Sequence, residues 1–205
     1  SSYLSPVFTK CFGDSTGEIN ILSTTGGVPP YTYDCSNGFS SNTNTIILAS
    51  AGHYTVIVSD AYNCEETLQF NVQDPPELTS NISITNIDCY GNNNGSIDFS
   101  PIGGVSGYSF LWSNNETTED LNNLSPGVYT VELTDSNGCV IFDTVSIIEP
   151  AELVLVSSIE NSVCNGEALG SIDITVSGGT GILLYDWSNS ETSEDLYNII
   201  AGTYT

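Results

Sequence analysis

Residues 89–100 read Cys-Tyr-Gly-Asn-Asn-Asn-Gly-Ser-Ile-Asp-Phe-Ser, and this stretch indicates the fold of the chain. Ile97 and Phe99 alternate with polar residues, a period of two that places apolar side chains on one face of a β-strand. The Gly- and Asn-rich residues before them are typical of a turn. The stretch therefore predicts a turn that leads into a strand with one buried face.

The same stretch occurs three times along the chain. Residues 11–19 read CFGDSTGEI, residues 89–97 read CYGNNNGSI and residues 164–172 read CNGEALGSI. Each copy is followed by a Gly-Gly pair, an aromatic segment that ends in Ser-Asn, and a Gly-x-Tyr-Thr motif. The copies recur every 75 residues or so, about the size of one small β domain. The chain is therefore predicted to be a tandem array.

Each copy predicts several short strands and none predicts a helix. We expect an all-β chain of tandem immunoglobulin-like β-sandwich repeats of about 75 residues. The predicted repeats are 1–74, whose first strand is expected to be incomplete, 75–149, and 150–205, which is expected to be truncated. Asp74-Pro75 and Glu149-Pro150 mark short joints that proline stiffens, so the array should form an extended rod.

The composition excludes two classes of partner. The 205 residues include 25 Asp or Glu and a single cation, Lys10, which gives a formal charge of −24. One cation does not neutralise a row of phosphates, so neither nucleic acid nor anionic lipid is an expected partner. No apolar run is long enough to span a membrane, and we expect no membrane insertion. Six cysteines in such a chain favour an oxidising, extracellular location.

The cysteines leave two pairings open. The structural disulfide candidates are Cys11, Cys64, Cys89, Cys139 and Cys164. If the repeats stack head to tail, Cys11 pairs with Cys139 and Cys89 pairs with a cysteine beyond residue 205. The alternative is one bridge within each repeat, Cys11–Cys64 and Cys89–Cys139, although these turns lie at opposite poles of an immunoglobulin-like sandwich. In either case, Cys164 lacks a partner within these residues.

Aromatic residues at repeated positions are the core candidates. Trp112 and Trp187 fit the buried tryptophan of a central strand, and Cys35 takes their place in the first copy, where a buried thiol is expected. Tyr54, Tyr129 and Tyr204 each follow a Gly-x pair, and the residues before Tyr129 and Tyr204 resemble the approach to a tyrosine corner. We expect these five aromatic side chains in the core.

No catalytic constellation is present in the sequence. His53 is the single histidine and is replaced by other residues in the other two copies, so it forms no repeated triad. The acidic residues Glu116, Glu119 and Asp120 recur as Glu191, Glu194 and Asp195. The first copy lacks them, which favours a solvated acidic face; a Ca²⁺ site stays open as the alternative. We therefore expect no enzyme activity and no cofactor other than this possible Ca²⁺.

The repeated motifs resemble the SprB repeat of Bacteroidota surface adhesins over essentially the whole chain. The resemblance is carried in the second copy by Cys89, Gly91, Gly95 and Ile97, by Gly103-Gly104, by Tyr108, Phe110, Trp112, Ser113 and Asn114, by Gly127, Tyr129, Thr130 and Val131, and by Thr134, Asp135, Gly138 and Cys139. The chain departs from the pattern at Cys35 and at Ala61-Tyr62-Asn63.

The resemblance implies a role in adhesion. A SprB repeat implies a long cell-surface protein that is exported by type IX secretion, associated with the outer membrane and known in the family as the mobile adhesin of gliding motility. The repeats would be its stalk, with neighbouring repeats as partners and with motor components engaged through other parts of the protein. The alternative is a binding module of a static or secreted adhesin that contacts surface polysaccharide or another substratum.

Overall fold

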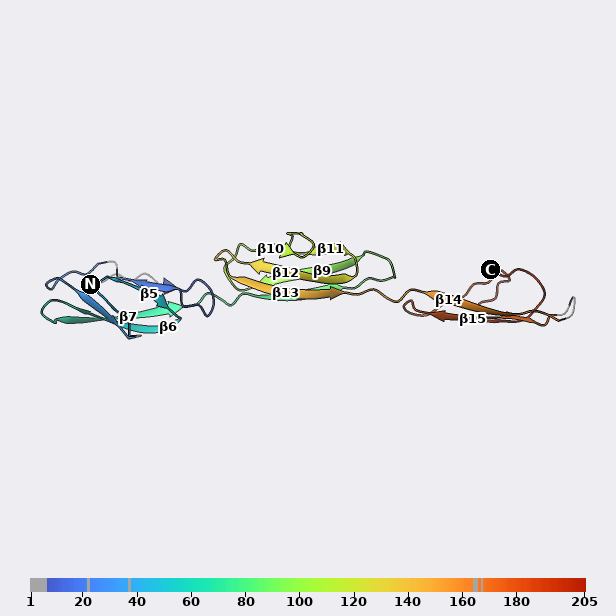
Figure 1. The fold of residues 1–205 in the computed structure, drawn as a ribbon, viewed down its shortest axis with the longest axis horizontal. Coiled ribbons are helices and arrows are strands. Elements are labelled where there is room, and N and C mark those ends of the chain that lie inside the picture. Colours follow the sequence, from blue (N-terminus) through green and yellow to red (C-terminus); the bar gives the residue numbers. More distant parts are fainter. Residues whose placement is uncertain (1–6, 22, 37, 164–165, 167) are drawn as a thin grey trace. The chain divides into compact units, whose positions relative to one another are not determined.

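The computed structural model describes residues 7–21, 23–36, 38–163, 166 and 168–205. Every regular element in these ranges is a β-strand (Figure 1). The chain divides into two compact units, Ser1–Ser83 with Asp98–Asp120 and Tyr129–Thr144, and Ile84–Ile97 with Leu121–Val128 and Val145–Thr205. These units do not follow the predicted repeat boundaries. Those boundaries therefore stay predictions, and so does the extended rod expected from the proline joints.

The first predicted repeat contains two sheets. Its strands are β1 (Val7–Phe8), β2 (Gly17–Asn20), β3 (Thr32–Cys35), β4 (Ser40–Ser41), β5 (Thr45–Ala49), β6 (Gly52–Ser59) and β7 (Glu65–Gln73). One sheet has the order β1-β7-β6-β3-β4 and the other pairs β2 with β5. Ile19 of β2 packs in one core with Val56 of β6 and Phe70 of β7, so the core lies between the two sheets. This is the arrangement of a β-sandwich.

The second predicted repeat also contributes two sheets. Its strands are β8 (Thr79–Thr85), β9 (Gly95–Ile102), β10 (Ser109–Trp112), β11 (Leu121–Leu124), β12 (Gly127–Thr134) and β13 (Val140–Ile147), in the orders β11-β9-β8 and β10-β12-β13. The Phe99 ring of β9 lies nearly perpendicular to the rings of Phe110 and Trp112 of β10, at centroid distances of 5.9 and 5.7 Å. These aromatic contacts join the faces of the two sheets.

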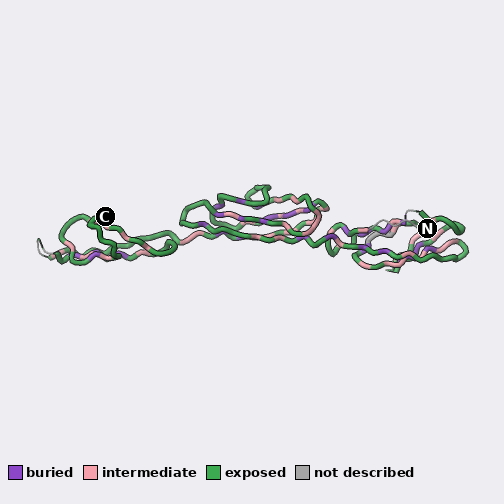
Figure 2. The backbone as a smooth tube through the Cα atoms, turned by 180° about the vertical axis from the view of Figure 1, so that it is seen from behind, coloured by how far each residue is buried: buried purple, intermediate pink, exposed green. Residues whose placement is uncertain are grey.

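The third predicted repeat has one sheet in the described residues. Its strands β14 (Val154–Glu160), β15 (Gly170–Ser177) and β16 (Leu196–Ile199) pair in that order. Its buried core consists of Ile172, Ile174 and Leu196. β15 has the same alternation of buried and exposed residues as β9, and Figure 2 shows this alternation along the strands.

The fold prediction from sequence is confirmed: the described chain is all-β and is built of immunoglobulin-like sandwich repeats. The repeated Gly-x-Ile motif has a packing reason. A Cβ on Gly17 would lie 2.6 Å from the Ala49 carbonyl oxygen, and one on Gly95 would lie 2.7 Å from Cγ2 of Ile147. Both approaches are too close for a side chain, so glycine lets the strand that follows each cysteine turn enter the sandwich.

Candidate functional site

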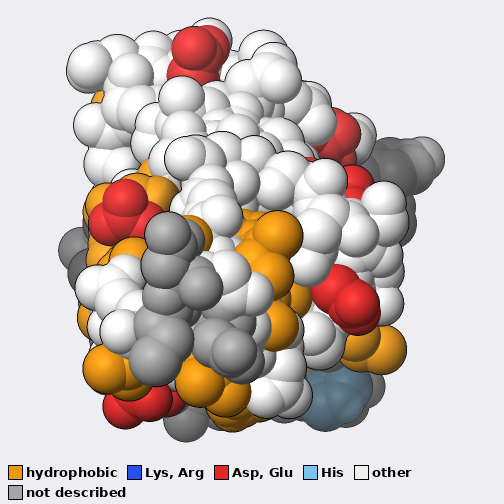
Figure 3. All heavy atoms as spheres, turned by 90° about the vertical axis from the view of Figure 1, so that its right-hand side faces the viewer, with side chains coloured by type: hydrophobic (Ala, Val, Ile, Leu, Met, Phe, Trp, Pro, Cys, Tyr) orange, Lys and Arg blue, Asp and Glu red, His pale blue; other side chains and the backbone are white. Residues whose placement is uncertain are grey.

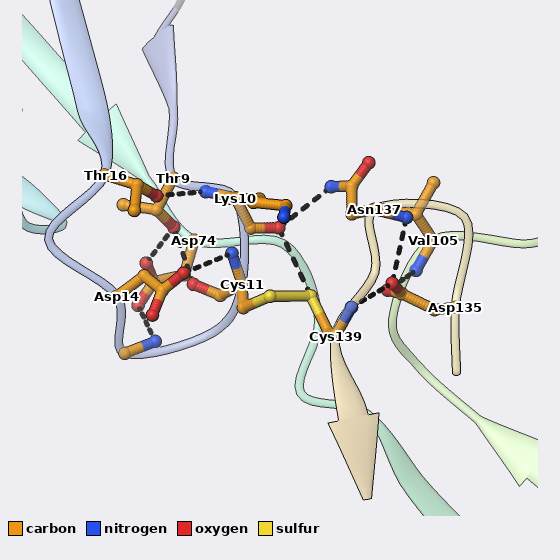
Figure 4. Close-up of a disulfide and its surroundings, with 11 residues drawn as sticks. Thr9, Lys10, Cys11, Asp14, Thr16, Asp74, Val105, Asp135, Asn137 and Cys139 are labelled. Atoms are coloured by element: carbon orange, nitrogen blue, oxygen red, sulfur yellow. Dashed lines mark hydrogen bonds between the residues drawn. A yellow bond between two sulfur atoms is a disulfide. The ribbon is translucent and has the colours of Figure 1, made fainter. Parts of the chain in front are cut away.

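The most distinctive chemical feature of the described chain is a disulfide between Cys11 and Cys139 (Figure 4). The two Cα atoms are 5.7 Å apart, within the usual range for a disulfide, and the cysteines are 128 positions apart in sequence. Cys11 belongs to the first predicted repeat and Cys139 to the second. The bond therefore joins two of the predicted repeats, and it excludes the alternative of Cys11–Cys64 and Cys89–Cys139 bridges.

The hairpin that carries Cys139 is held by one buried carboxylate. Asp135 is 4% exposed. Its Oδ1 accepts hydrogen bonds from the backbone N–H groups of Asn137 at 2.9 Å and Cys139 at 2.8 Å, and its Oδ2 accepts one from Val105 at 2.8 Å. Burial raises the pKa of Asp135, but these backbone donors outweigh it and bring the pKa below the ordinary 3.8. The ionised carboxylate thus shapes the hairpin and fastens it to the loop at Val105.

The turn that carries Cys11 is held by carboxylates as well. The Cys11 N–H donates to Asp14 Oδ2 at 3.2 Å, and the Gly13 N–H donates to Asp74 Oδ2 at 3.1 Å. Asp74 also accepts a hydrogen bond from the Thr9 hydroxyl. Asp74 precedes the proline of the joint, so the acidic residue of the Asp-Pro pair anchors the cysteine turn to the end of the repeat.

The turn and the hairpin touch beyond the sulfur atoms. The Lys10 carbonyl oxygen accepts a hydrogen bond from Asn137 Nδ2 at 2.9 Å, and Cys139 Sγ lies 3.4 Å from the same oxygen. Figure 4 shows the turn at Cys11 facing the hairpin at Cys139. The disulfide therefore belongs to a small polar contact that also includes the chain's single cationic residue.

Two other candidate cysteines lie in matching local structure without a disulfide. Cys64 is exposed in a hairpin whose Asp60 accepts from the N–H groups of Tyr62, Cys64 and Val28, at 2.8, 2.9 and 2.9 Å. The N–H of Cys64 first, and then those of Val28 and Tyr62, lower the pKa of Asp60. Cys89 is also exposed. Cys164 lies outside the described residues, and Cys35 is a buried thiol in the core of the first repeat.

The predicted core aromatics differ in burial. Trp112 is fully buried at 1% exposure, with its Nε1 donating to the Thr118 carbonyl at 2.9 Å. Tyr54, Tyr129, Trp187 and Tyr204 are only half-buried. The hydroxyls of Tyr54 and Tyr204 donate to the carbonyls of Ser50 and Ile200, four residues upstream, at 2.9 and 3.0 Å. These are the bonds of a tyrosine corner, and a hydroxyl that reaches the loop keeps the ring near the surface.

The acidic residues on the predicted solvated face include two with a structural role that the sequence did not reveal. Asp120 Oδ1 accepts a hydrogen bond from the Phe99 N–H at 3.0 Å, and Asp195 accepts from Ile174 at the same distance. In the first repeat, the backbone carbonyl of Asn44 instead accepts a hydrogen bond from the N–H of Ile21, the residue equivalent to Phe99. To identify this exchange of a side-chain acceptor for a backbone carbonyl, an alignment of the three copies would have needed the strand register of the structure.

No arrangement for chemistry is evident among the described residues. His53 is exposed on β6. Within the described ranges, no group of three or more His, Cys, Asp or Glu residues could hold a metal ion. The face in Figure 3 shows uncharged side chains and backbone, an area of apolar side chains and separate carboxylates. No helix that could cross a membrane occurs in the part of the chain that the structure describes.

Solved structures similar to this chain include several immunoglobulin-domain proteins. The N-terminal eight Ig domains of Down Syndrome Cell Adhesion Molecule isoform 1.30.30 match at 10% identity and a TM-score of 0.44, over 91% of this chain and 28% of that one. The amphioxus IgVJ-C2 molecule matches at 10% identity and 0.32, over 66% and 97%. Murine CEACAM1b matches at 10% identity and 0.30, over 70% and 98%. A search of curated proteins finds no match.

The sequence-family comparison matches all three predicted copies. The SprB repeat matches residues 9–39, 81–117 and 156–192. Each matched segment contains the Gly-x-Ile strand entry, the Gly-Gly loop and the aromatic segment described above. The matches together cover half of the chain, and the chain belongs to the SprB repeat family as a repeat region of the surface-adhesin type.

Proposed function

We propose that this chain is a stalk segment of a long cell-surface adhesin filament, namely the mobile adhesin of gliding motility in a Bacteroidota cell. In this proposal the filament leaves the cell by type IX secretion and is held at the outer membrane, and engaged by motor components, through other parts of the protein. The observation that carries the proposal is the disulfide between Cys11 of one repeat and Cys139 of the next.

A disulfide at this place suits a stalk because it changes which residues bear load. When the ends of the chain are pulled, force passes from Cys11 directly to Cys139 through the sulfur atoms. The residues between them then carry no tension, although they include most strands of the first two repeats. A filament that is dragged over a surface would keep these domains folded under loads that unfold an unlinked array.

A single-molecule pulling experiment tests the stalk proposal. The full chain is held by its termini and stretched with and without a reductant. We expect the oxidised chain to extend to a contour length about 450 Å shorter than that of the reduced chain, because the disulfide bridges a sequence separation of 128 positions. The Cys11→Ser variant should behave as the reduced chain under both conditions. Equal contour lengths with and without reductant would contradict a load-bearing disulfide.

Live-cell imaging tests the gliding assignment separately. A fluorescent antibody against residues 75–149 is applied to a gliding strain that expresses the parent protein. Label that travels along the cell supports the mobile adhesin. Label that stays fixed, or that is shed into the medium, contradicts this assignment and favours a static or secreted adhesin built from the same repeats.

A binding module for surface polysaccharide is the second candidate, and one repeated loop favours it. The backbone N–H of Trp112 donates to the Glu116 carbonyl at 2.9 Å, and the backbone N–H of Trp187 donates to the Glu191 carbonyl at 3.0 Å. The two loops thus share one turn, with exposed polar side chains on it. A glycan array with and without added Ca²⁺ tests this candidate, since specific binding that is lost in the Asn114→Ala/Asn189→Ala variant would support a glycan site on the loop.

A further inference from the structure

The turn at Cys89 has the construction of the turn at Cys11. The N–H of Asn92 donates to the Cys89 carbonyl at 3.1 Å, as that of Asp14 donates to the Cys11 carbonyl at 3.1 Å. The Gly91 N–H donates to Glu149 Oε2 at 2.8 Å, and in the turn at Cys11 the Gly13 N–H donates to Asp74 in the same way. Glu149 and Asp74 each precede the proline of a joint. Cys89 is therefore held in the geometry of a cysteine that is already bonded elsewhere in the chain, yet its thiol is exposed.

A pocket of about 420 Å³ lies beside Cys89. It is lined by the cysteine turn, by the joint at 150–153, and by the loop that contains Gly179 and Thr180. Gly179 donates its N–H to the Ala151 carbonyl at 2.9 Å. The pocket is therefore formed by three backbone segments in fixed hydrogen-bonded positions.

The preceding joint shows what occupies a pocket of this kind. There Gly104 donates its N–H to the Pro76 carbonyl at 2.9 Å, which makes Gly104 and Val105 the counterparts of Gly179 and Thr180. The Val105 N–H donates a hydrogen bond to the Asp135 carboxylate. The hairpin that starts at Asp135 ends at Cys139, which forms the disulfide with Cys11. Turn, joint, Gly-Gly loop and hairpin thus form one assembly around the disulfide.

We propose that the pocket beside Cys89 binds an Asp-x-x-x-Cys hairpin of the SprB type, placed on the loop at Gly179 as residues 135–139 are placed on the loop at Gly104, and that Cys89 forms a disulfide with the cysteine of that hairpin. The hairpin's carboxylate accepts the N–H of Thr180, and its cysteine meets Cys89. Among the described residues Thr180 N–H has no hydrogen-bond partner. The inference rests on the contacts at Cys11 and Cys139 and is independent of the gliding assignment.

The bond forms by thiol–disulfide exchange. The thiolate of Cys89 attacks glutathione disulfide and releases one glutathione thiol, which leaves a mixed disulfide on Cys89. The hairpin thiolate then displaces the second glutathione. Two protein thiols are oxidised to one disulfide, and one glutathione disulfide is reduced to two thiols, so that electrons and protons balance. The required oxidant is a disulfide of this class.

A synthetic peptide with the sequence of residues 131–143 is the probe, since it contains the Asp-Ser-Asn-Gly-Cys hairpin of this chain. The full chain with Cys164→Ser is equilibrated with the peptide in a glutathione redox buffer, and mixed disulfides are quantified by mass-spectrometric mapping. Cys64 is the matched control because it is exposed as well, but lies on a hairpin of the donor type. We expect at least tenfold more peptide on Cys89 than on Cys64.

Two variants show whether the pocket directs the pairing. A peptide with Asp135→Asn keeps its thiol but loses the carboxylate, and it should lose most of the preference for Cys89. Gly179→Ala should do the same, because a Cβ on its counterpart Gly104 would lie 2.9 Å from Asp135 Oδ2. Equal labelling of Cys89 and Cys64 by the original peptide would overturn the proposal, as would a preference that survives both changes. Neither result would affect the pulling experiment, which depends on Cys11.

Discussion

The second and third repeats share a sequence pattern but differ in structure at their tryptophans. Residues 110–112 lie in β10, which pairs with β12, and Trp112 is buried there at 1% exposure. Residues 185–187 have the same pattern but form no strand, and Trp187 is half-buried. Both repeats have the same turn after the tryptophan, since the backbone N–H of each tryptophan donates to the carbonyl of the glutamate four residues later. Local sequence thus determines the turn, whereas the strand depends on a pairing partner, and residues 202–205 correspond only to the first half of β12.

The largest effect should distinguish these two tryptophans. Trp112→Ala removes a buried ring that packs against Phe99, and should lower the free energy of unfolding of the second repeat by about 4 kcal/mol. Trp187→Ala should cost the third repeat less than half as much, because its ring is partly in water already. Amide hydrogen exchange, followed separately for β9 and β15, measures both changes in the same sample. Equal losses would show that Trp187 belongs to a core as complete as that of Trp112.

The Gly-Gly loops allow a second comparison. Both Gly104 and Gly179 have positive φ, +60° and +69°, so alanine is strained at either position. A Cβ on Gly104 would in addition lie 2.9 Å from Asp135 Oδ2, whereas one on Gly179 would lie 3.0 Å from the flexible end of Leu153. We expect Gly104→Ala to cost about 3 kcal/mol and Gly179→Ala about 1 kcal/mol. Urea unfolding of the two variants measures the difference, and identical costs would mean that backbone strain alone explains both.

The same contrast explains what could be foreseen from sequence. Strand entry at Ile97 and burial of Trp112 follow from alternation and from the repeat, because both are encoded within one copy. The repeat also limited the cysteine pairing to two alternatives. The Cys11–Cys139 bond was preferred because the two cysteine turns of one repeat are expected at opposite ends of its sandwich. The anchoring roles of Asp74, Glu149 and Asp120 were not foreseen. Each of these carboxylates accepts a hydrogen bond from a backbone N–H far away in sequence, and an acidic residue in a polar loop gives no pattern that separates it from a solvated one.

The pH dependence of the second repeat should be smaller in size than the glycine effect. The pKa of Asp135 is lowered in the folded state relative to 3.8, so its contribution to stability is complete above the unfolded pKa and is lost as pH falls through the folded pKa. We expect the second repeat to lose stability as the pH falls from 4 to 2, by less than Gly104→Ala costs. The Trp187→Phe variant leaves Trp112 as the single tryptophan to follow this loss by fluorescence during urea titrations at each pH. Asp135→Asn in that background should flatten the dependence, and an unchanged slope would exclude Asp135 as its source.

The smallest effect concerns a feature that the third repeat has in spite of its single sheet. Tyr204 donates its hydroxyl to the Ile200 carbonyl at 3.0 Å and packs on the core formed by Ile172, Ile174 and Leu196. Tyr204→Phe keeps the ring and removes only the hydrogen bond, so it should cost about 1 kcal/mol. Tyr54→Phe is the matched change in the first repeat, where the hydroxyl bonds the Ser50 carbonyl at 2.9 Å. Hydrogen exchange of β16 and β6 compares the two: similar losses would mean that a tyrosine corner stabilises its loop locally, whereas a loss confined to Tyr54 would mean that the corner needs the second sheet beneath it.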